Sequence, residues 1–182
     1  VTYYLPLTTT TAKVKITAKN GGGTVQAGQT ISFYTTWAGT GAGNVSPQSG
    51  ATYVTNVVTD AAGVAEYEVT QTTPQAGSTA TITITGASTA TGVSEFAAVT
   101  LSWPTPTISS ITVTSPNATS KVAPAGSVTV TAVAKDQFGN AVGAGYVIQP
   151  SLSSTSANYS TTPMASLTTN ASGEVSVTLT GG

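Results

Sequence analysis

Apolar and polar residues alternate along most of this chain, and no segment shows the three-to-four-residue spacing of an amphipathic helix. Between residues 12 and 18, Val14 and Ile16 fall on one face of the expected strand, and Lys13 and Lys15 fall on the other. Similar runs, bounded by Gly, Pro and Asn, are found at residues 30–37, 65–69, 79–85, 96–103, 111–114, 128–134, 146–148 and 175–179. The pattern therefore predicts an all-β chain.

A proline-containing segment divides the chain into two parts. Residues 103–107 read Trp-Pro-Thr-Pro-Thr, and two prolines favour an extended, semi-rigid connection. We therefore predict an N-terminal extension at residues 1–11, one sandwich at 12–103, a linker at 104–107 and a second sandwich at 108–182. Short strands at regular spacing in units of this size are typical of an immunoglobulin-like β-sandwich.

The two halves are similar enough to suggest one repeated unit. Residues 13–20 (Lys-Val-Lys-Ile-Thr-Ala-Lys-Asn) align with residues 110–117 (Ser-Ile-Thr-Val-Thr-Ser-Pro-Asn), and residues 25–28 align with 122–126. Residues 59–63 (Thr-Asp-Ala-Ala-Gly) align with residues 169–173 (Thr-Asn-Ala-Ser-Gly). A repeat of this length predicts tandem domains of one architecture.

A family resemblance becomes visible in the second half. Residues 128–142 (Val-Thr-Val-Thr-Ala-Val-Ala-Lys-Asp-Gln-Phe-Gly-Asn-Ala-Val) and residues 169–179 resemble the bacterial immunoglobulin-like repeats of invasin- and intimin-type adhesins. Similar repeats occur in bacterial and archaeal surface-layer proteins. The first half resembles them loosely, because no Asp-Gln-Phe-Gly-Asn counterpart follows Trp37. The resemblance implies a cell-surface building block or spacer, and it identifies no ligand.

The repeat alignment leaves an imbalance between the two ends. After Gly63 the first unit continues through two more predicted strands to Trp103, whereas Gly182 follows closely after Gly173. We therefore expect the second sandwich to lack one or two closing strands. Residues 1–10 precede the first aligned strand, and their alternation places Val1, Tyr3, Leu5 and Leu7 on one apolar face.

These two features together predict head-to-tail assembly. The N-terminal strand of one subunit would complete the second sandwich of a neighbouring copy, a recognition mode known from pilus assembly. A contact that does not close on itself produces a filament. The architecture resembles donor-strand pili, including archaeal threads built from two-domain β subunits. The main alternative is a spacer segment of a longer surface-layer protein or adhesin, and a glycan-binding module is a third reading that no residue spacing supports.

The composition excludes some classes of binding partner. Only 6% of the residues are charged, with five Lys, no Arg and a net charge of −1. So few cations cannot form the basic surface that nucleic acid requires. No apolar run approaches the length of a transmembrane helix. We expect an extracellular or cell-surface protein whose partners are neighbouring copies of the same chain, without nucleic acid and without membrane insertion.

Candidate chemistry is sparse. The chain has no His and no Cys, so a nucleophile activated by His and a zinc site are both excluded. Glu66 and Glu68 share a face, but we expect that face to be exposed beside the lysines. Asp136 and Asn140 flank an expected tight turn and offer too few oxygens for Ca²⁺. We predict no enzyme activity, no catalytic residue, no cofactor and no metal.

Four asparagines stand in Asn-x-Ser/Thr sequons: Asn44, Asn117, Asn158 and Asn170. Asn117 and Asn158 lie in expected loops and are the better acceptors for covalent N-glycans, provided that the source glycosylates asparagine. Asn44 is followed closely by Pro47, and Asn170 lies in an expected tight turn.

Overall fold

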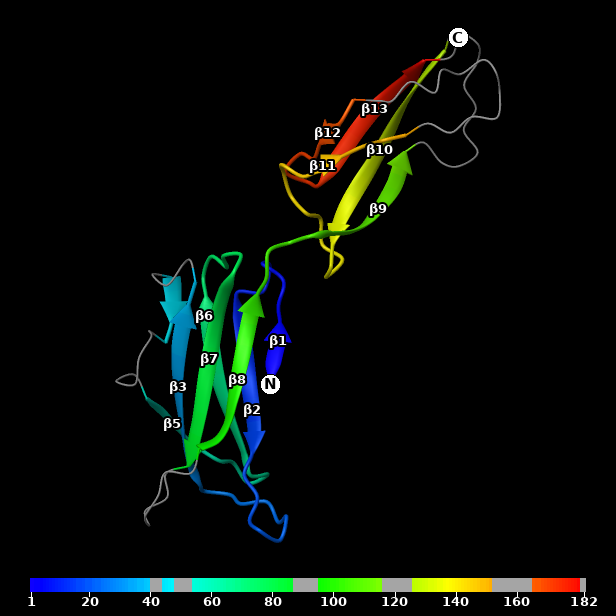
Figure 1. Ribbon diagram of the computed structural model, residues 1–182. Helices are drawn as coiled ribbons and strands as arrows, with labels where there is room; N and C mark the ends of the chain where they lie inside the picture. The colour runs from blue at the N-terminus through cyan, green and yellow to red at the C-terminus, as the bar shows by residue number, and fades with distance from the viewer. Residues whose placement is uncertain (40–43, 48–53, 87–94, 116–125, 152–164, 181–182) are drawn as a thin grey trace. The chain divides into compact units, whose positions relative to one another are not determined.

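The structure, a computed structural model of the chain, describes residues 1–39, 44–47, 54–86, 95–115, 126–151 and 165–180. The chain divides into two compact units, Val1–Thr105 and Pro106–Gly182. Every regular element among the described residues is a strand, which confirms the predicted all-β class (Figure 1).

The first unit consists of two sheets that face each other. One sheet has the order β1-β8-β7-β3-β5, and the other has the order β2-β6-β4 (Figure 1). The strands of the larger sheet are β1 (Thr2–Tyr4), β3 (Thr30–Ala38), β5 (Thr55–Val58), β7 (Ser78–Gly86) and β8 (Glu95–Trp103). Those of the smaller sheet are β2 (Thr11–Thr17), β4 (Val45–Ser46) and β6 (Val64–Gln71).

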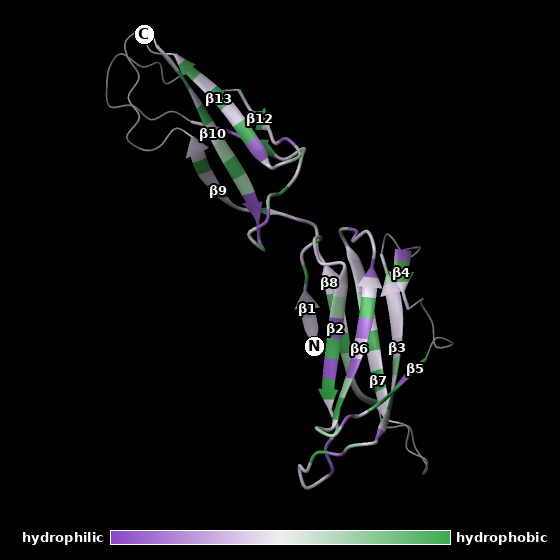
Figure 2. Ribbon diagram, turned by 180° about the vertical axis from the view of Figure 1, so that it is seen from behind, coloured by the Kyte–Doolittle hydropathy of each residue, from purple (hydrophilic) through white to green (hydrophobic). Residues whose placement is uncertain are grey.

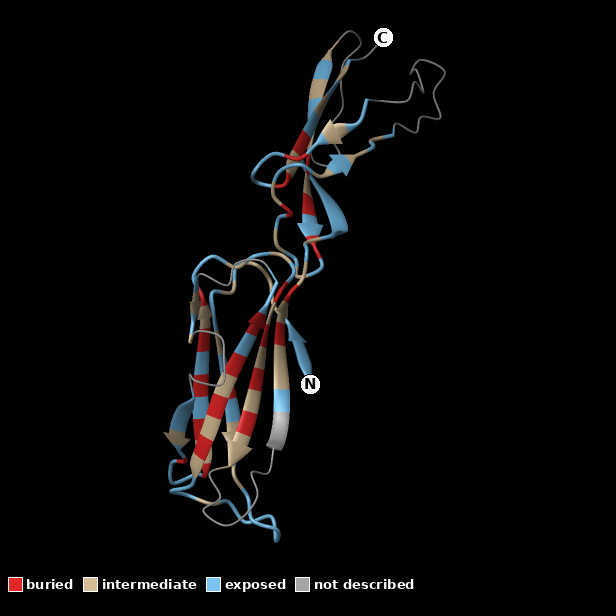
Figure 3. Ribbon diagram, turned by 60° about the vertical axis from the view of Figure 1, so that its left-hand side comes forward, coloured by how far each residue is buried: buried red, intermediate tan, exposed pale blue. Residues whose placement is uncertain are grey.

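The alternating residues of these strands meet in one core (Figure 3). Phe33 on β3 stacks on Tyr67 of β6 with ring centroids 4.8 Å apart, and the Tyr67 hydroxyl lies 2.8 Å from Thr35 Oγ1. Trp37 and Trp103 form a second stacked pair at 5.9 Å. These four aromatic residues are buried, and the Phe96 side chain lies outside the described residues.

The second unit has a smaller described core. One sheet has the order β13-β10-β9, from β9 (Ile108–Ser115), β10 (Ser127–Asp136) and β13 (Glu174–Thr180). A short sheet pairs β11 (Val147–Ile148) with β12 (Leu167–Thr168). Its buried apolar residues are Ala132, Ala134, Val142 and Val175.

The same hydrogen-bonded framework occurs in both units. In the first, Asn20 Oδ1 accepts hydrogen bonds from the backbone N–H groups of Gly22 and Thr24. In the second, Asp136 Oδ1 accepts the corresponding bonds from Phe138 and Asn140. The turns after β5 and β12 match in the same way, with Asp60 and Asn170 as the acceptors. Thr59 and Thr169 also make matching hydroxyl bonds, Thr59 to Gln26 O and Thr169 to Gly143 O.

This framework corrects the repeat alignment proposed from the sequence. The counterpart of β2 is β10 rather than β9, and the counterpart of the Asp-Gln-Phe-Gly-Asn segment at 136–140 is residues 20–24. Residues 25–28 correspond to residues 141–145 and not to 122–126. The alignment of residues 59–63 with 169–173 agrees with the matching bonds.

Other strands of the two units also correspond. β6 corresponds to β13, and the pairing of Thr30 and Ile31 with Val58 and Val57 corresponds to that of β11 with β12. Among its described residues, the second unit has no counterpart of β7 or β8.

Candidate functional site

The N-terminal segment, which the sequence analysis assigned to pairing with a neighbouring copy, has a partner within its own unit. β1 pairs in parallel with β8, with Tyr3 opposite Leu101. The Val1 ammonium group donates to Ala98 O at 3.1 Å, and Leu5 N donates to Ser102 O at 2.8 Å. A parallel partner almost a hundred residues away leaves no local signal in the sequence.

Only part of this segment is held by side-chain packing. Val1, Tyr3 and Tyr4 are 82%, 55% and 65% exposed, so all of β1 lies on the surface (Figure 3). Leu5 and Leu7 are half-buried and pack against the core of the first unit. Detaching residues 1–4 from the first unit would therefore expose little additional apolar surface. Detaching residues 5–7 would expose more, because Leu5 and Leu7 are half-buried.

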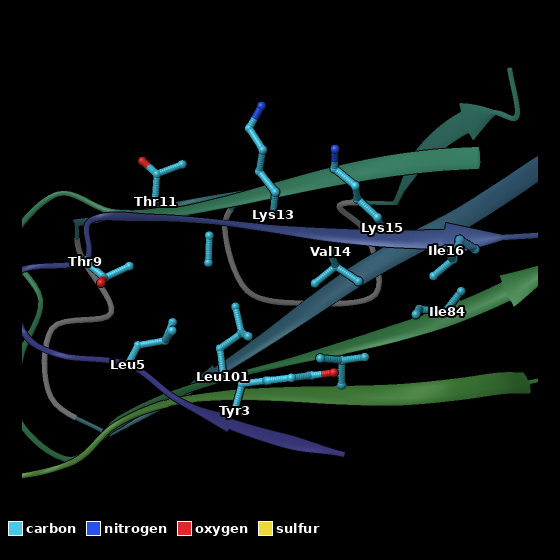
Figure 4. Close-up of a pocket in the computed structure, with 12 residues that line it drawn as sticks. Tyr3, Leu5, Thr9, Thr11, Lys13, Val14, Lys15, Ile16, Ile84 and Leu101 are labelled. Carbon is cyan, nitrogen blue, oxygen red and sulfur yellow. The ribbon is translucent and has the colours of Figure 1, made fainter. Parts of the chain in front are cut away.

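A groove of about 450 Å³ lies between this segment and β2. Tyr3, Leu5 and Leu101 lie on one side of it and Val14 on the other, while Lys13 and Lys15 point away (Figure 4). In the described part of the first unit, β2 is the edge strand of its sheet at this groove, whereas β9 covers the corresponding edge of β10 in the second unit.

The second unit presents an apolar sheet face that its described residues only partly cover. The pairing of β10 with β9 and β13 places Ile111, Val113, Val130, Val177 and Leu179 on the face that carries Ala132 and Ala134. Ile111 and Val113 are 49% and 58% exposed, and Val130, Val177 and Leu179 are half-buried. Val130, Val177 and Leu179 correspond to Val14, Tyr67 and Val69 of the first unit. All three of these first-unit residues are buried. We name this surface, residues 111, 113, 130, 177 and 179, the acceptor face.

In the first unit, the solvent-facing side of strands β2 and β6 carries a small ladder of charged residues. Lys13 Nζ lies 2.8 Å from Glu66 Oε1, and Lys15 Nζ lies 2.9 Å from Glu66 Oε2. Hydrogen bonds from Lys13 and then Lys15 lower the pKa of Glu66 from 4.5 to about 2. The prediction that Glu66 and Glu68 lie on an exposed face beside these lysines agrees with the structure. Figure 2 shows the alternation of hydrophilic and hydrophobic residues along β2.

The second unit carries hydroxyl groups where the first carries these charges. Thr129 pairs with Thr178 and Thr131 with Ser176, with oxygen atoms 3.1 and 3.0 Å apart. These positions match those of the charged ladder, which indicates that the fold accepts either chemistry on this face.

Replacing the charged ladder by hydroxyls is expected to change the pH dependence of stability more than stability itself. The variant carries Lys13→Thr, Lys15→Thr, Glu66→Ser and Glu68→Thr. Because the pKa of Glu66 is depressed in the folded state, its contribution is present above pH 4.5 and is lost as the pH falls toward 2. The exposed position makes this contribution small and sensitive to salt. Thermal melts should show a difference between the two proteins that shrinks from pH 5 to pH 2 and in 1 M NaCl; a constant difference would contradict this.

Reactive groups are few in the described part of the chain. There, no three carboxylates lie close enough together to hold a metal ion. Asp136 is buried and its Oδ1 caps the turn at residues 136–140, as described above. No helix among the described residues has the length and hydropathy needed to cross a membrane.

The four sequons have different surroundings. Asn117 and Asn158 lie outside the described residues. Asn44 is exposed, and its Nδ2 donates to Thr73 Oγ1 at 3.0 Å. Asn170 is exposed and caps its turn through Oδ1, as Asp60 does in the first unit. Its Nδ2, the atom that a glycan would modify, lies 3.3 Å from Glu174 Oε2.

Comparison of the chain with protein-family models, with curated proteins and with solved structures finds no match. The sequence predicted a donated N-terminal strand and a second sandwich that lacks closing strands, but it did not identify the residues of the acceptor face. The alternation at residues 111–114, 128–134 and 175–179 predicts that these residues face inward, but it does not show what covers them.

Proposed function

We propose that this chain is a structural subunit of an extracellular filament, assembled head to tail by strand donation between copies. Each unit is an immunoglobulin-like sandwich in this proposal. In support, the first unit places β2-β6-β4 and β3-β7-β8 in two facing sheets, which corresponds to the B-E-D and C-F-G strands of that fold.

The observation that carries the proposal is the acceptor face. It presents half-exposed Val and Leu side chains at positions where the first unit, covered by β7 and β8, buries their counterparts. The chain also has a strand to donate, since β1 is exposed and Val1, Tyr3, Leu5 and Leu7 provide an alternating apolar side. A neighbour's N-terminal strand on this face would bury apolar surface on both partners.

The contact joins different surfaces of two copies, so it does not close and continues into a filament. The partners in this proposal are neighbouring copies of the same chain, with N-glycans as an added covalent modification. A surface rich in hydroxyl groups and poor in charge suits an extracellular milieu, because its interactions change little with salt or pH. The role is mechanical and not enzymatic.

The first test is to remove β1. We expect the intact chain to form fibres in negative-stain electron microscopy and large particles in light scattering, and a chain lacking residues 1–4 to form neither. Those residues are exposed, so the truncated chain should still fold, and circular dichroism provides the control. If both chains remain folded monomers, strand donation is wrong and a spacer segment of a surface protein is the better interpretation.

A further inference from the structure

The same turn occurs four times among the described residues, twice in each unit. In each copy, Oδ1 of an Asn or Asp side chain accepts hydrogen bonds from the backbone N–H groups two and four residues later. The capping residues are Asn20, Asp60, Asp136 and Asn170. Three residues after each of them, a glycine with positive φ donates to the carbonyl oxygen of the capping residue. One turn geometry therefore exists in this chain with both an amide and a carboxylate as the cap.

The two amide copies of this turn differ in the residue that follows the asparagine. Asn20 is followed by Gly21, whereas Asn170 is followed by Ala171, and no other asparagine of the chain precedes a glycine. Both asparagines are exposed. Among the described residues, the N–H group of Gly21 donates no hydrogen bond, and a Cβ added to this residue would meet no atom within 4 Å. The backbone nitrogen of Gly21 is therefore unhindered.

We propose that Asn20 is a site of spontaneous covalent modification, at which the asparagine becomes an aspartate through a cyclic imide. The backbone nitrogen of Gly21 attacks the side-chain carbonyl carbon, Cγ, of Asn20 and forms a new C–N bond. The bond between Cγ and Nδ2 breaks, and Nδ2 leaves as ammonia with the proton of the Gly21 N–H group. Water then adds to one of the two carbonyl carbons of the ring and opens it. The reaction needs water alone, without an enzyme or a partner chain.

The residue after the asparagine controls the rate of ring closure. Closure requires the backbone nitrogen of that residue to approach Cγ, and a Cβ on the same residue restricts the main-chain dihedral angles and crowds the approach. Gly21 has no Cβ, whereas Ala171 has one. At Asn170, Nδ2 also donates to Glu174 Oε2 at 3.3 Å. We therefore expect Asn20 to react much faster than Asn170, although both side chains make the same caps.

The aspartate product fits the turn. A carboxylate oxygen can accept both capping bonds, as Asp60 and Asp136 do in the same turn of this chain. Hydrogen bonds to an ionised acceptor are also the stronger ones. Ring opening at the other carbonyl carbon would lengthen the main chain by one carbon atom and displace the carbonyl group that accepts from Gly23. The turn therefore favours the ordinary aspartate, which adds one negative charge to a chain whose net charge is −1.

The capping bonds of Asn20 oppose the reaction. They hold Oδ1 on the N–H groups of Gly22 and Thr24, at 3.0 Å each, so the turn must open before Cγ can meet the nitrogen of Gly21. Residues 20–24 are all exposed, and none of them has a large apolar side chain. Opening therefore uncovers no apolar core, which makes it one of the less costly local motions of this unit.

A reciprocal exchange of the following residue tests this proposal. Gly21→Ala gives Asn20 the neighbour that Asn170 has, and Ala171→Gly gives Asn170 the neighbour that Asn20 has. Gly21 has no positive φ, and alanine occupies the matching place at Ala61, so we expect Gly21→Ala to fold normally. The three full-length chains are incubated in mildly alkaline buffer made with H₂¹⁸O. Mass spectrometry of peptides that contain each asparagine then measures the labelled carboxyl groups formed during incubation.

In the unsubstituted chain, we expect Asn20 to gain a labelled carboxyl group roughly tenfold faster than Asn170, or faster still. Gly21→Ala should slow the reaction of Asn20 by a similar factor, and Ala171→Gly should accelerate that of Asn170. Equal rates at the two asparagines, or rates that neither exchange changes, would overturn the proposal. The variant Asn20→Asp should unfold at the same urea concentration as the unsubstituted chain, and a clear loss of stability would show that the turn does not accept the product.

Discussion

Tyr3→Asp is expected to abolish filament formation, whereas Tyr4→Asp is expected to leave it nearly unchanged. Both side chains are more than half exposed in the isolated chain, so either substitution should be tolerated by the fold of the first unit. In a donated strand the two residues face opposite sides. Tyr3 points into the acceptor core, where a carboxylate would lose its hydration without gaining a partner, while Tyr4 points to solvent.

The two variants control for each other, because they make the same chemical change at neighbouring residues. Light scattering over a concentration series measures assembly, and circular dichroism checks that both proteins are folded. We expect at least a hundredfold rise in the concentration at which Tyr3→Asp assembles. Equal behaviour of the two variants would mean that the face of the N-terminal strand carrying Tyr3 does not enter a core.

Trp103→Ala is expected to destabilise the first unit by roughly 3–5 kcal/mol, the usual range for removing a buried tryptophan. Trp103 is fully buried, stacks on Trp37, and donates from Nε1 to Thr9 O at 2.9 Å. That bond also fixes the chain directly after residues 1–7, the proposed donor strand. The loss would therefore leave a cavity and an unpaired carbonyl group at the start of the first sandwich.

Urea unfolding followed by tryptophan fluorescence measures this effect selectively, because both tryptophans of the chain lie in the first unit. Trp37 remains as the reporter in the variant. Trp103→Phe is the matched control: it keeps most of the buried ring but not the donor, so we expect a smaller loss. A loss below about 1 kcal/mol for Trp103→Ala would contradict the packing described for this core.

The long strands were predictable because their residues alternate and their ends carry turn residues. The segments expected at 30–37, 79–85 and 128–134 correspond to β3, β7 and β10 with shifts of one or two residues. The short strands β4, β5 and β12 were missed, since two to four residues are too few to show alternation. Their positions depend on neighbours that are distant in the sequence.

The repeat alignment failed for a physical reason. Both β9 and β10 alternate in the same way as β2, so alternation alone could not select the counterpart. The turn after the strand decides it. Asn20 and Asp136 use the same oxygen to cap two backbone N–H groups, and Gly23 and Gly139 follow with φ values of 82° and 83°. Asn and Asp are interchangeable as such acceptors, which concealed the match between Asn-Gly-Gly-Gly-Thr and Asp-Gln-Phe-Gly-Asn.

The site was predictable only in part. Alternation identified the apolar side of residues 1–7, but it could not show that β1 rests on β8 in its own unit, since a parallel pairing depends on residues that are distant in the chain. The exposure of the acceptor face could not be predicted from the sequence either. An inward-facing Val gives the same alternating pattern whether or not a second sheet covers it. Matched positions of the two units differ in this respect: Tyr67 is buried, and Val177 is half-buried.

Mixing two complementary variants tests the central claim most directly. Tyr3→Asp disables the donor and keeps the acceptor face, and Val177→Asp disables the acceptor face and keeps the donor. Sedimentation velocity should show each variant alone as a monomer and their equimolar mixture as a discrete heterodimer, because one intact donor can meet one intact acceptor. A mixture that remains monomeric, or a variant that dimerises alone, would contradict head-to-tail strand donation.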